Sequence, residues 1–208
     1  MKVGAVLSRV TVSPSFLAFF CAYYYFDPGG TFWPFFCGVC AHEAGHLLLL
    51  KILKVPVHHL RLGASGACLR TGTMSYRQEL LVALAGPAVN LLLAVYFLHC
   101  APMTALVNLA LLLYNLLPFY PLDGGRFLRC LLRLLLKEGR AAQVTEQIVS
   151  GLCLFAFWGC GIYMTCCLHE GLWPVLLCAL LTVRISGTIF PLYRNFAHKR
   201  IDKSRHTC

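Results

Sequence analysis

The stretch FWPFFCGVCAHEAGHLLLLKIL, residues 32–53, decides the fold, because it is apolar and long enough to cross a membrane as a helix. Its central ionisable residues are His42, Glu43 and His46. Residues four positions apart share a helix face, so His42 and His46 lie together with Glu43 beside them. This H-E-x-x-H spacing is that of two imidazoles that hold a zinc ion and a carboxylate that acts as general base. Ionisable side chains are costly inside a membrane, so these three are candidate functional residues.

The composition is that of a membrane protein. Of the 208 residues, 59% are hydrophobic and 12% are charged, which several membrane-spanning segments would explain. The formal net charge of +10 comes from Lys and Arg at the ends of apolar segments, and this distribution is typical of cytoplasmic loops. Most of the 12 cysteines lie in apolar segments, where buried thiols act as small hydrophobic side chains. We expect one domain, residues 1–208, that binds no nucleic acid.

The hydrophobic pattern predicts six membrane-spanning helices. They cover residues 10–26, 32–53, 77–99, 104–136 with an interruption at 115–126, 149–167 and 173–189, with a polar link at 137–146. Residues 55–75 differ, because their glycines, proline and short alternating runs are typical of a β-hairpin. The expected fold class is an all-α polytopic membrane protein with six transmembrane helices and a small membrane-associated β-hairpin.

The distribution of basic residues predicts the orientation. With six spans, the loops on one side of the membrane are residues 27–31, 100–103 and 168–172, and none of them contains Lys or Arg. The basic residues therefore belong to the other side, which is cytoplasmic by the positive-inside rule. We expect a multi-pass protein of the cell membrane with both termini in the cytoplasm.

The interruption in the fourth span has the sequence NLLPFYPLDGGR, residues 115–126. Its two prolines and two glycines do not continue a regular helix. Irregular backbone at membrane depth is tolerated only where protein covers it or water lines it, so we expect this segment and Asp123 to face a polar cavity.

Asp123 is the predicted third metal ligand. A catalytic zinc typically has three protein ligands and an open position for water. Of the eight acidic residues, all but Glu43 and Asp123 fall in or beside polar links, turns or the tail. With His42, His46 and Asp123 on the metal, Glu43 is left to take a proton from water and pass it to a leaving amine. Bound zinc lowers the pKa of water to about 7 and polarises a scissile carbonyl.

Three motifs together resemble the site-2 protease family of intramembrane zinc metalloproteases. They are HEAGH at residues 42–46, Gly86-Pro87 in the next helix, and the segment at residues 115–126, in the family's order. The compact layout is most similar to the sporulation branch, which processes the precursor of sigma-K. The resemblance extends over roughly residues 10–195. Unlike that branch, the chain is expected to contain no CBS domain, and it has no PDZ insertion.

The resemblance implies a zinc site of His42, His46 and Asp123, with Glu43 as catalytic base and Asn115 in a substrate-binding or site-shaping role. It implies cleavage of a membrane-associated protein segment near the cytosolic face of the bilayer, that is, regulated intramembrane proteolysis. For the sporulation branch it also implies a pro-sigma factor as substrate, membrane regulatory proteins as partners, and the membrane around the forespore as location. We further expect an edge of the hairpin to accept an extended substrate strand.

Three questions stay open at this level. Histidines and an aspartate inside helices can also line an ion path, so a membrane metal-binding or transport protein is the alternative function. Transporters commonly show internal repeats, and none is visible in this sequence.

Asn90 either offers a hydrogen bond inside the membrane or accompanies a packed kink at Gly86-Pro87. His58 and His59 are expected at the interface and not on the metal, because strand neighbours point to opposite faces.

Overall fold

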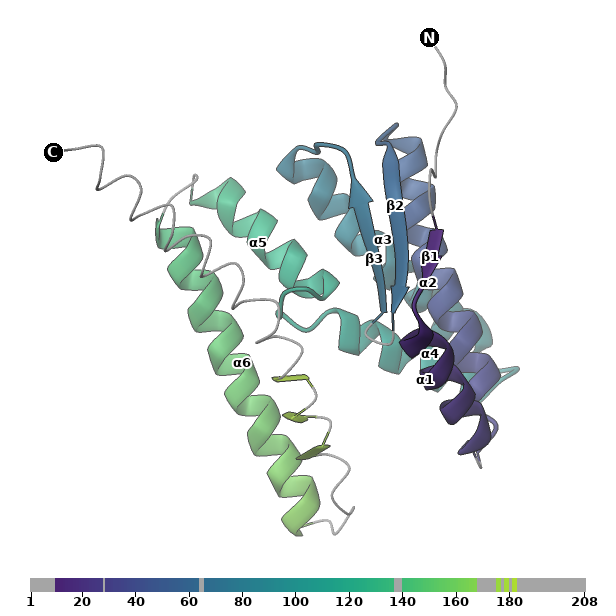
Figure 1. Ribbon diagram of the computed structural model, residues 1–208. Coiled ribbons are helices and arrows are strands. Elements are labelled where there is room, and N and C mark those ends of the chain that lie inside the picture. Colours follow the sequence, from purple (N-terminus) through teal and green to yellow (C-terminus); the bar gives the residue numbers. More distant parts are fainter. Residues whose placement is uncertain are drawn as a thin grey trace, which may run out of the picture.

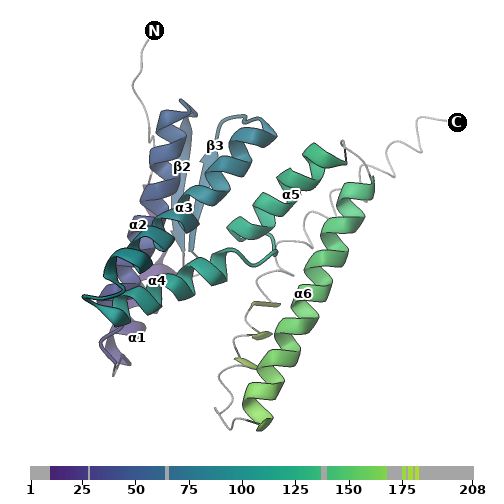
Figure 2. The ribbon, with the colours of Figure 1, turned by 180° about the vertical axis from the view of Figure 1, so that it is seen from behind.

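A computed structural model describes residues 10–27, 29–63, 66–136, 140–167, 175–176, 178–179 and 181–182. Its elements are β1 (Val10–Val12), α1 (Pro14–Tyr25), α2 (Phe32–Ile52), β2 (Val57–Gly63), β3 (Gly66–Thr71), α3 (Tyr76–Phe97), α4 (Pro102–Asn115), α5 (Asp123–Leu135) and α6 (Arg140–Cys167). The central helix α3 contacts α2, α4 and α5, and α5 in turn contacts α6 (Figure 1). Figure 2 shows from behind that α5 lies between α3 and α6.

Three helices are long and apolar enough to cross a membrane, judged by length and composition: α2, α3 and α6. α4 is apolar but has only 14 residues. Large apolar side chains face outward on these helices; Leu92, Tyr96 and Phe155 are 69%, 74% and 80% exposed. The residues that the structure describes therefore support three of the six predicted spans. Most of the sixth, residues 173–189, and the basic tail lie outside them.

The first predicted span, residues 10–26, is wrong at its start. Val10–Val12 form strand β1, which pairs in parallel with β2, and α1 has only 12 residues. β-Branched residues such as valine and threonine favour a strand. Thr11 Oγ1 also lies 3.0 Å from His59 Nε2 of β2, within hydrogen-bond distance. The sheet therefore has three strands in the order β1–β2–β3, where the sequence predicted two.

The predicted hairpin is confirmed, and it packs on the helices. β2 and β3 are antiparallel, with Leu60 opposite Leu69. Leu50 of α2, Val57 of β2 and Val82 of α3 are buried in one apolar cluster. Burial of apolar surface is the main favourable term in folding, so this cluster fixes the sheet against the two helices.

The start of α2 is set by Asp27. Its Oδ2 accepts a hydrogen bond from the Phe32 N–H at 2.7 Å, and its Oδ1 accepts one from Thr31 Oγ1 at 2.8 Å. A carboxylate at this place satisfies a free helix N–H and complements the helix dipole. Desolvation acts to raise the pKa of Asp27, but these hydrogen bonds outweigh it and hold the pKa below its ordinary value.

α2 and α3 approach each other closely at Gly45. A Cβ at this position would lie 2.8 Å from Val89 Cγ2 and 2.9 Å from the Ala85 carbonyl oxygen, closer than real Cβ contacts. The fourth residue of HEAGH is therefore glycine because α3 leaves no room for a side chain. Pro87 lies inside α3, which continues past it without interruption.

The segment between α4 and α5 is shorter than predicted. The break at residues 115–126 was expected to reach Arg126, but α5 begins at Asp123 and contains both glycines in its first turn. A Cβ at Gly124 would overlap the Leu116 carbonyl, and one at Gly125 would overlap the backbone of Phe119. The glycines are needed because the turn folds back against the helix start, and this packing places Asp123.

Replacing Gly125 by alanine should therefore destabilise the protein. Overpacking against backbone that cannot move aside costs typically about 1–3 kcal/mol, which chemical or thermal unfolding in detergent measures. Gly151→Ala on α6 is the matched control, because a Cβ there meets nothing within 4 Å. The control is expected to be at least as stable as the parent, since alanine favours helix. Equal stability of the two variants would contradict this packing.

The polar link predicted at residues 137–146 is also wrong in length. α6 begins at Arg140, and Glu146 lies inside it. Arg129 of α5 binds the Glu146 carboxylate through Nη2 at 2.8 Å and Nε at 3.0 Å, which joins α5 to α6. Residues 140–148 include alanine, arginine, glutamine and glutamate, which are good helix formers, and this propensity explains the longer helix.

The described cysteines are all free thiols, as expected, but only Cys130 and Cys178 are buried. Most of the others lie on outward helix surfaces.

Candidate metal centre

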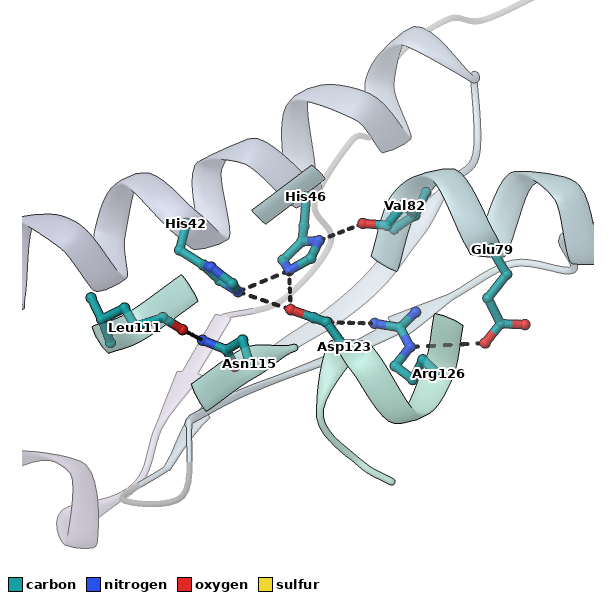
Figure 3. A network of polar contacts seen from close by, with 8 residues as sticks. All are labelled: His42, His46, Glu79, Val82, Leu111, Asn115, Asp123 and Arg126. Atoms are coloured by element: carbon teal, nitrogen blue, oxygen red, sulfur yellow. Dashed lines mark hydrogen bonds and ion pairs between the residues drawn. The ribbon is translucent and has the colours of Figure 1, made fainter. Parts of the chain in front are cut away.

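Three side chains from two distant segments meet in the centre of the molecule. His42 and His46 lie on one face of α2, and Asp123 is the first residue of α5 (Figure 3). Asp123 Oδ2 lies 3.0 Å from His42 Nε2 and 3.1 Å from His46 Nε2, and the two Nε2 atoms are 3.1 Å apart. The three potential ligand atoms thus form a nearly equilateral triangle.

The hydrogen bond at the far side of His46 defines its tautomer. His46 Nδ1 is 2.7 Å from the Val82 carbonyl oxygen, which can only accept, so Nδ1 carries the proton. His46 Nε2 is then free to act as a metal ligand in the neutral ring. A carbonyl or carboxylate in this position is the usual partner of a metal-bound histidine.

The donor set and its spacing fit a zinc ion. Ligand atoms about 2.0 Å from a tetrahedral zinc lie about 3.3 Å from one another, close to the triangle observed here. Three atoms with lone pairs repel one another at this separation unless a cation, either a proton or a metal ion, lies among them. His42, His46 and Asp123 are only 5%, 3% and 8% exposed, and low dielectric strengthens the attraction of such a cation. The three residues form a candidate metal site.

Space for an ion is left by Gly86 of α3. A Cβ at Gly86 would be 2.6 Å from His42 Nε2 and closer still to His46 Nε2. The α3 backbone therefore passes directly beside the two ligand nitrogens, and only the absence of a side chain keeps that place open.

Glu43 adjoins the cluster without joining it. It is partly buried on α2, and its charge interacts with His42, His46 and Asp123. Within the described part of the chain its carboxylate makes no hydrogen bond or ion pair. A general base beside a metal has to be free of close hydrogen-bond and ion-pair partners, and Glu43 meets this condition within the described residues.

The second oxygen of Asp123 faces a cation. Arg126 Nη1 lies 3.7 Å from Asp123 Oδ1, and Arg126 Nε lies 3.8 Å from Glu79 Oε1 of α3 (Figure 3). Sequence reasoning placed Glu79 beside a polar link and gave it no role. Gly86, Val82 and Arg126 were also without assigned roles, because only packing brings them to the site; the Gly86-Pro87 pair and Arg126 were visible as parts of motifs.

The other predicted residues lie outside the cluster. Asn115 Nδ2 donates to the Leu111 carbonyl at 3.0 Å in its own helix, and its substrate-binding role stays a prediction. Asn90 is fully buried, and neither of its amide atoms has a hydrogen-bond partner among the described residues. His58 and His59 lie on β2 and are not among the three residues of the candidate metal site.

The chain is similar to several known proteins. A model of Peptidase family M50 matches residues 97–157. A candidate zinc metalloprotease of Synechocystis sp. is 34% identical over 109 residues, 45% of this chain and 29% of the relative. A zinc metalloprotease of Methanocaldococcus jannaschii is 29% identical over 110 residues, 47% of this chain and 32% of the relative. Stage IV sporulation protein FB of Bacillus subtilis is 26% identical over 183 residues, 81% of this chain and 61% of the relative.

The fold also has a known counterpart. The site-2 protease from Methanocaldococcus jannaschii superposes with a TM-score of 0.57 at 19% identity, over 86% of this chain and 89% of that chain. The chain spans less than two thirds of the length of the relatives matched by sequence. The superposition shows that the fold is that of a site-2 protease. Together with the family match, it confirms the resemblance of the chain to the site-2 protease family, Peptidase family M50.

Proposed function

We propose that the protein is an intramembrane zinc metalloprotease that hydrolyses a peptide bond in or near the membrane segment of a membrane-associated protein. The observation that carries this proposal is the triangle of His42, His46 and Asp123, with Glu43 beside it and without a hydrogen-bond or ion-pair partner among the described residues. The matches to zinc metalloproteases support the choice of zinc and of proteolysis. The three candidate spans support a location in the cell membrane, where we propose six spans and cytoplasmic termini.

The roles of the residues follow from their contacts. His42, His46 and Asp123 would hold zinc, which supplies Lewis acidity toward water and the scissile carbonyl. Glu43 accepts the proton of the attacking water and donates it to the leaving amine. Val82 holds the His46 ring in the tautomer that presents Nε2 to the metal. The apolar helices around the site exclude bulk water, which strengthens these interactions.

A substrate has to be extended at the cleaved bond, because a helix hides its carbonyls in hydrogen bonds. β2 is paired on both sides, with β1 and β3, so the two edges of the described sheet belong to β1 and β3, and within the hairpin only β3 has an open edge. We propose that this edge binds the substrate segment by strand addition. Likeness to a stage IV sporulation protein supports a finer proposal: the substrate is a pro-sigma factor, processed at the membrane around the forespore with membrane regulatory proteins.

The test is a cleavage assay with metal removal. The purified chain, in nanodiscs with membrane-tethered precursors that include a pro-sigma factor, is expected to cut at least one of them. A zinc chelator should abolish the cleavage, and added Zn²⁺ should restore it, because metal affinity resides in the folded site. Zinc movement across liposomes without cleavage of any precursor would favour the transport alternative and contradict the proposal.

A further inference from the structure

Three residues on one face of α3 are connected to the three residues of the proposed metal site. Glu79, Val82 and Gly86 follow one another at spacings of three and four residues, so they share a helix face. Val82 accepts the hydrogen bond from His46, and Gly86 leaves the space beside the ligand nitrogens. Glu79 reaches Arg126, and Arg126 reaches Asp123. α3 thus contacts the histidines directly and the aspartate through an arginine.

We propose that Arg126, held by Glu79, is a positioning residue that fixes Asp123 for metal binding. This inference rests on the proposed zinc site. Asp123 directs Oδ2 at both imidazoles, while Oδ1 faces the Arg126 guanidinium at 3.7 Å. A carboxylate beside a fixed cation on one oxygen has fewer orientations available, and the other oxygen is kept toward the metal.

The need for such a partner follows from the chain path. Asp123 is the first residue of α5 and comes directly after an irregular turn, whereas the histidines lie on the separate helix α2. Arg126 lies one turn further along α5, so it moves together with Asp123. Glu79 is on α3, which packs against both α2 and α5. The Glu79–Arg126 pair therefore holds α5, which carries Asp123, in a fixed position against α3, which orients His46.

Glu79 also has an electrostatic task. A guanidinium this near a metal ligand repels a divalent cation, which weakens metal binding. The Glu79 carboxylate, 3.8 Å from Arg126 Nε, offsets that positive charge. Loss of Glu79 alone should then leave an uncompensated cation beside the site. Loss of both Glu79 and Arg126 should weaken metal binding less than the sum of the two single effects.

A purely structural role is the alternative to exclude. The Arg126 and Glu79 side chains are 24% and 33% exposed, and ion pairs this exposed contribute little to folding stability. Positioning therefore predicts a large change in metal affinity with a small change in thermal stability. A purely structural role predicts a small change in metal affinity with a large change in thermal stability.

The experiment measures Zn²⁺ affinity of the full chain by competition with a chelator, together with thermal unfolding and the absorption spectrum of the Co²⁺ form. Arg126→Gln and Glu79→Gln are each expected to weaken Zn²⁺ binding about 10–100-fold, the usual effect of removing a partner of a ligand. Arg126→Lys should recover part of the affinity, and the double variant should bind better than the product of the single losses predicts. The Co²⁺ spectrum of Arg126→Gln should shift, because ligand geometry changes.

Arg133→Gln is the matched control. Arg133 is on the same helix and lies over the Tyr76 ring of α3, 5.5 Å from its centroid, so it also joins α5 to α3. Its loss should leave Zn²⁺ affinity unchanged. Equal affinity of Arg126→Gln and Arg133→Gln, with the wild type binding Zn²⁺ tightly, would overturn the positioning role alone. A wild type that binds no Zn²⁺ would overturn the proposed function as well.

Discussion

Replacing Glu43 by glutamine is expected to abolish peptide cleavage while the metal stays bound. Glutamine has nearly the shape of glutamate but cannot accept the proton of the attacking water. Loss of a general base typically lowers the rate about 10²–10⁴-fold. Glu43 makes no hydrogen bond or ion pair with the three ligand residues among the described residues, so zinc content should equal that of the wild type. The measurement pairs zinc analysis with the rate of cleavage in the same sample.

Glu146→Gln is the control for this substitution. It removes a carboxylate of the same kind that pairs with Arg129, away from the ligand triangle. Cleavage per folded molecule should stay near the wild-type rate, although folding stability should fall. If Glu43→Gln cut as fast as this control, Glu43 would not be the base. If it lost its zinc, Glu43 would belong to the ligand set instead.

Replacing Gly86 by alanine should have an effect of similar size by a different route. The new methyl group would overlap His46 Nε2 and lie 2.6 Å from His42 Nε2, so it would press on two of the three proposed ligand atoms. Either the imidazoles rotate away or α3 moves outward, and both remove the ligand geometry. Displacing ligands should cost more than the loss of an outer partner, so we expect Zn²⁺ affinity to fall by more than about 100-fold, with loss of cleavage.

The control is Gly159→Ala on α6, where a Cβ meets nothing within 4 Å. It makes the same chemical change in a helix and should leave both Zn²⁺ affinity and cleavage unchanged. A Gly86→Ala protein that bound Zn²⁺ as tightly as this control would show that α3 does not border the metal position.

The elements that the sequence predicted well are those with a strong local signal. Long apolar runs defined α2, α3 and most of α6, and alternation with glycine defined the hairpin. β1 was missed because three residues joined to an apolar helix carry no pattern of their own; the strand exists because β2 offers a free edge. The start of α5 was missed because glycine usually ends a helix, whereas Gly124 and Gly125 are needed here for close packing.

The site shows the same division. The sequence predicted His42 and His46 as metal ligands from their spacing, and Asp123 from its depth and motif. Each of them has an ionisable side chain, which is unusual inside a membrane. The parts that support them could not be predicted. Val82 acts through its backbone, Gly86 through the absence of a side chain, and Glu79 through a contact with a residue 47 positions later. Such roles depend on how helices pack and leave no local signature.

The most direct test of the metal centre is zinc X-ray absorption spectroscopy on the purified wild-type chain. We expect one zinc per chain, bound by nitrogen and oxygen atoms at about 2.0–2.1 Å, with the scattering pattern of two imidazole rings and a signal that disappears in His42→Ala and Asp123→Ala. The chain has 12 cysteines that could bind zinc instead. Sulfur ligands at about 2.3 Å, or an unchanged spectrum in the two variants, would contradict the site described here.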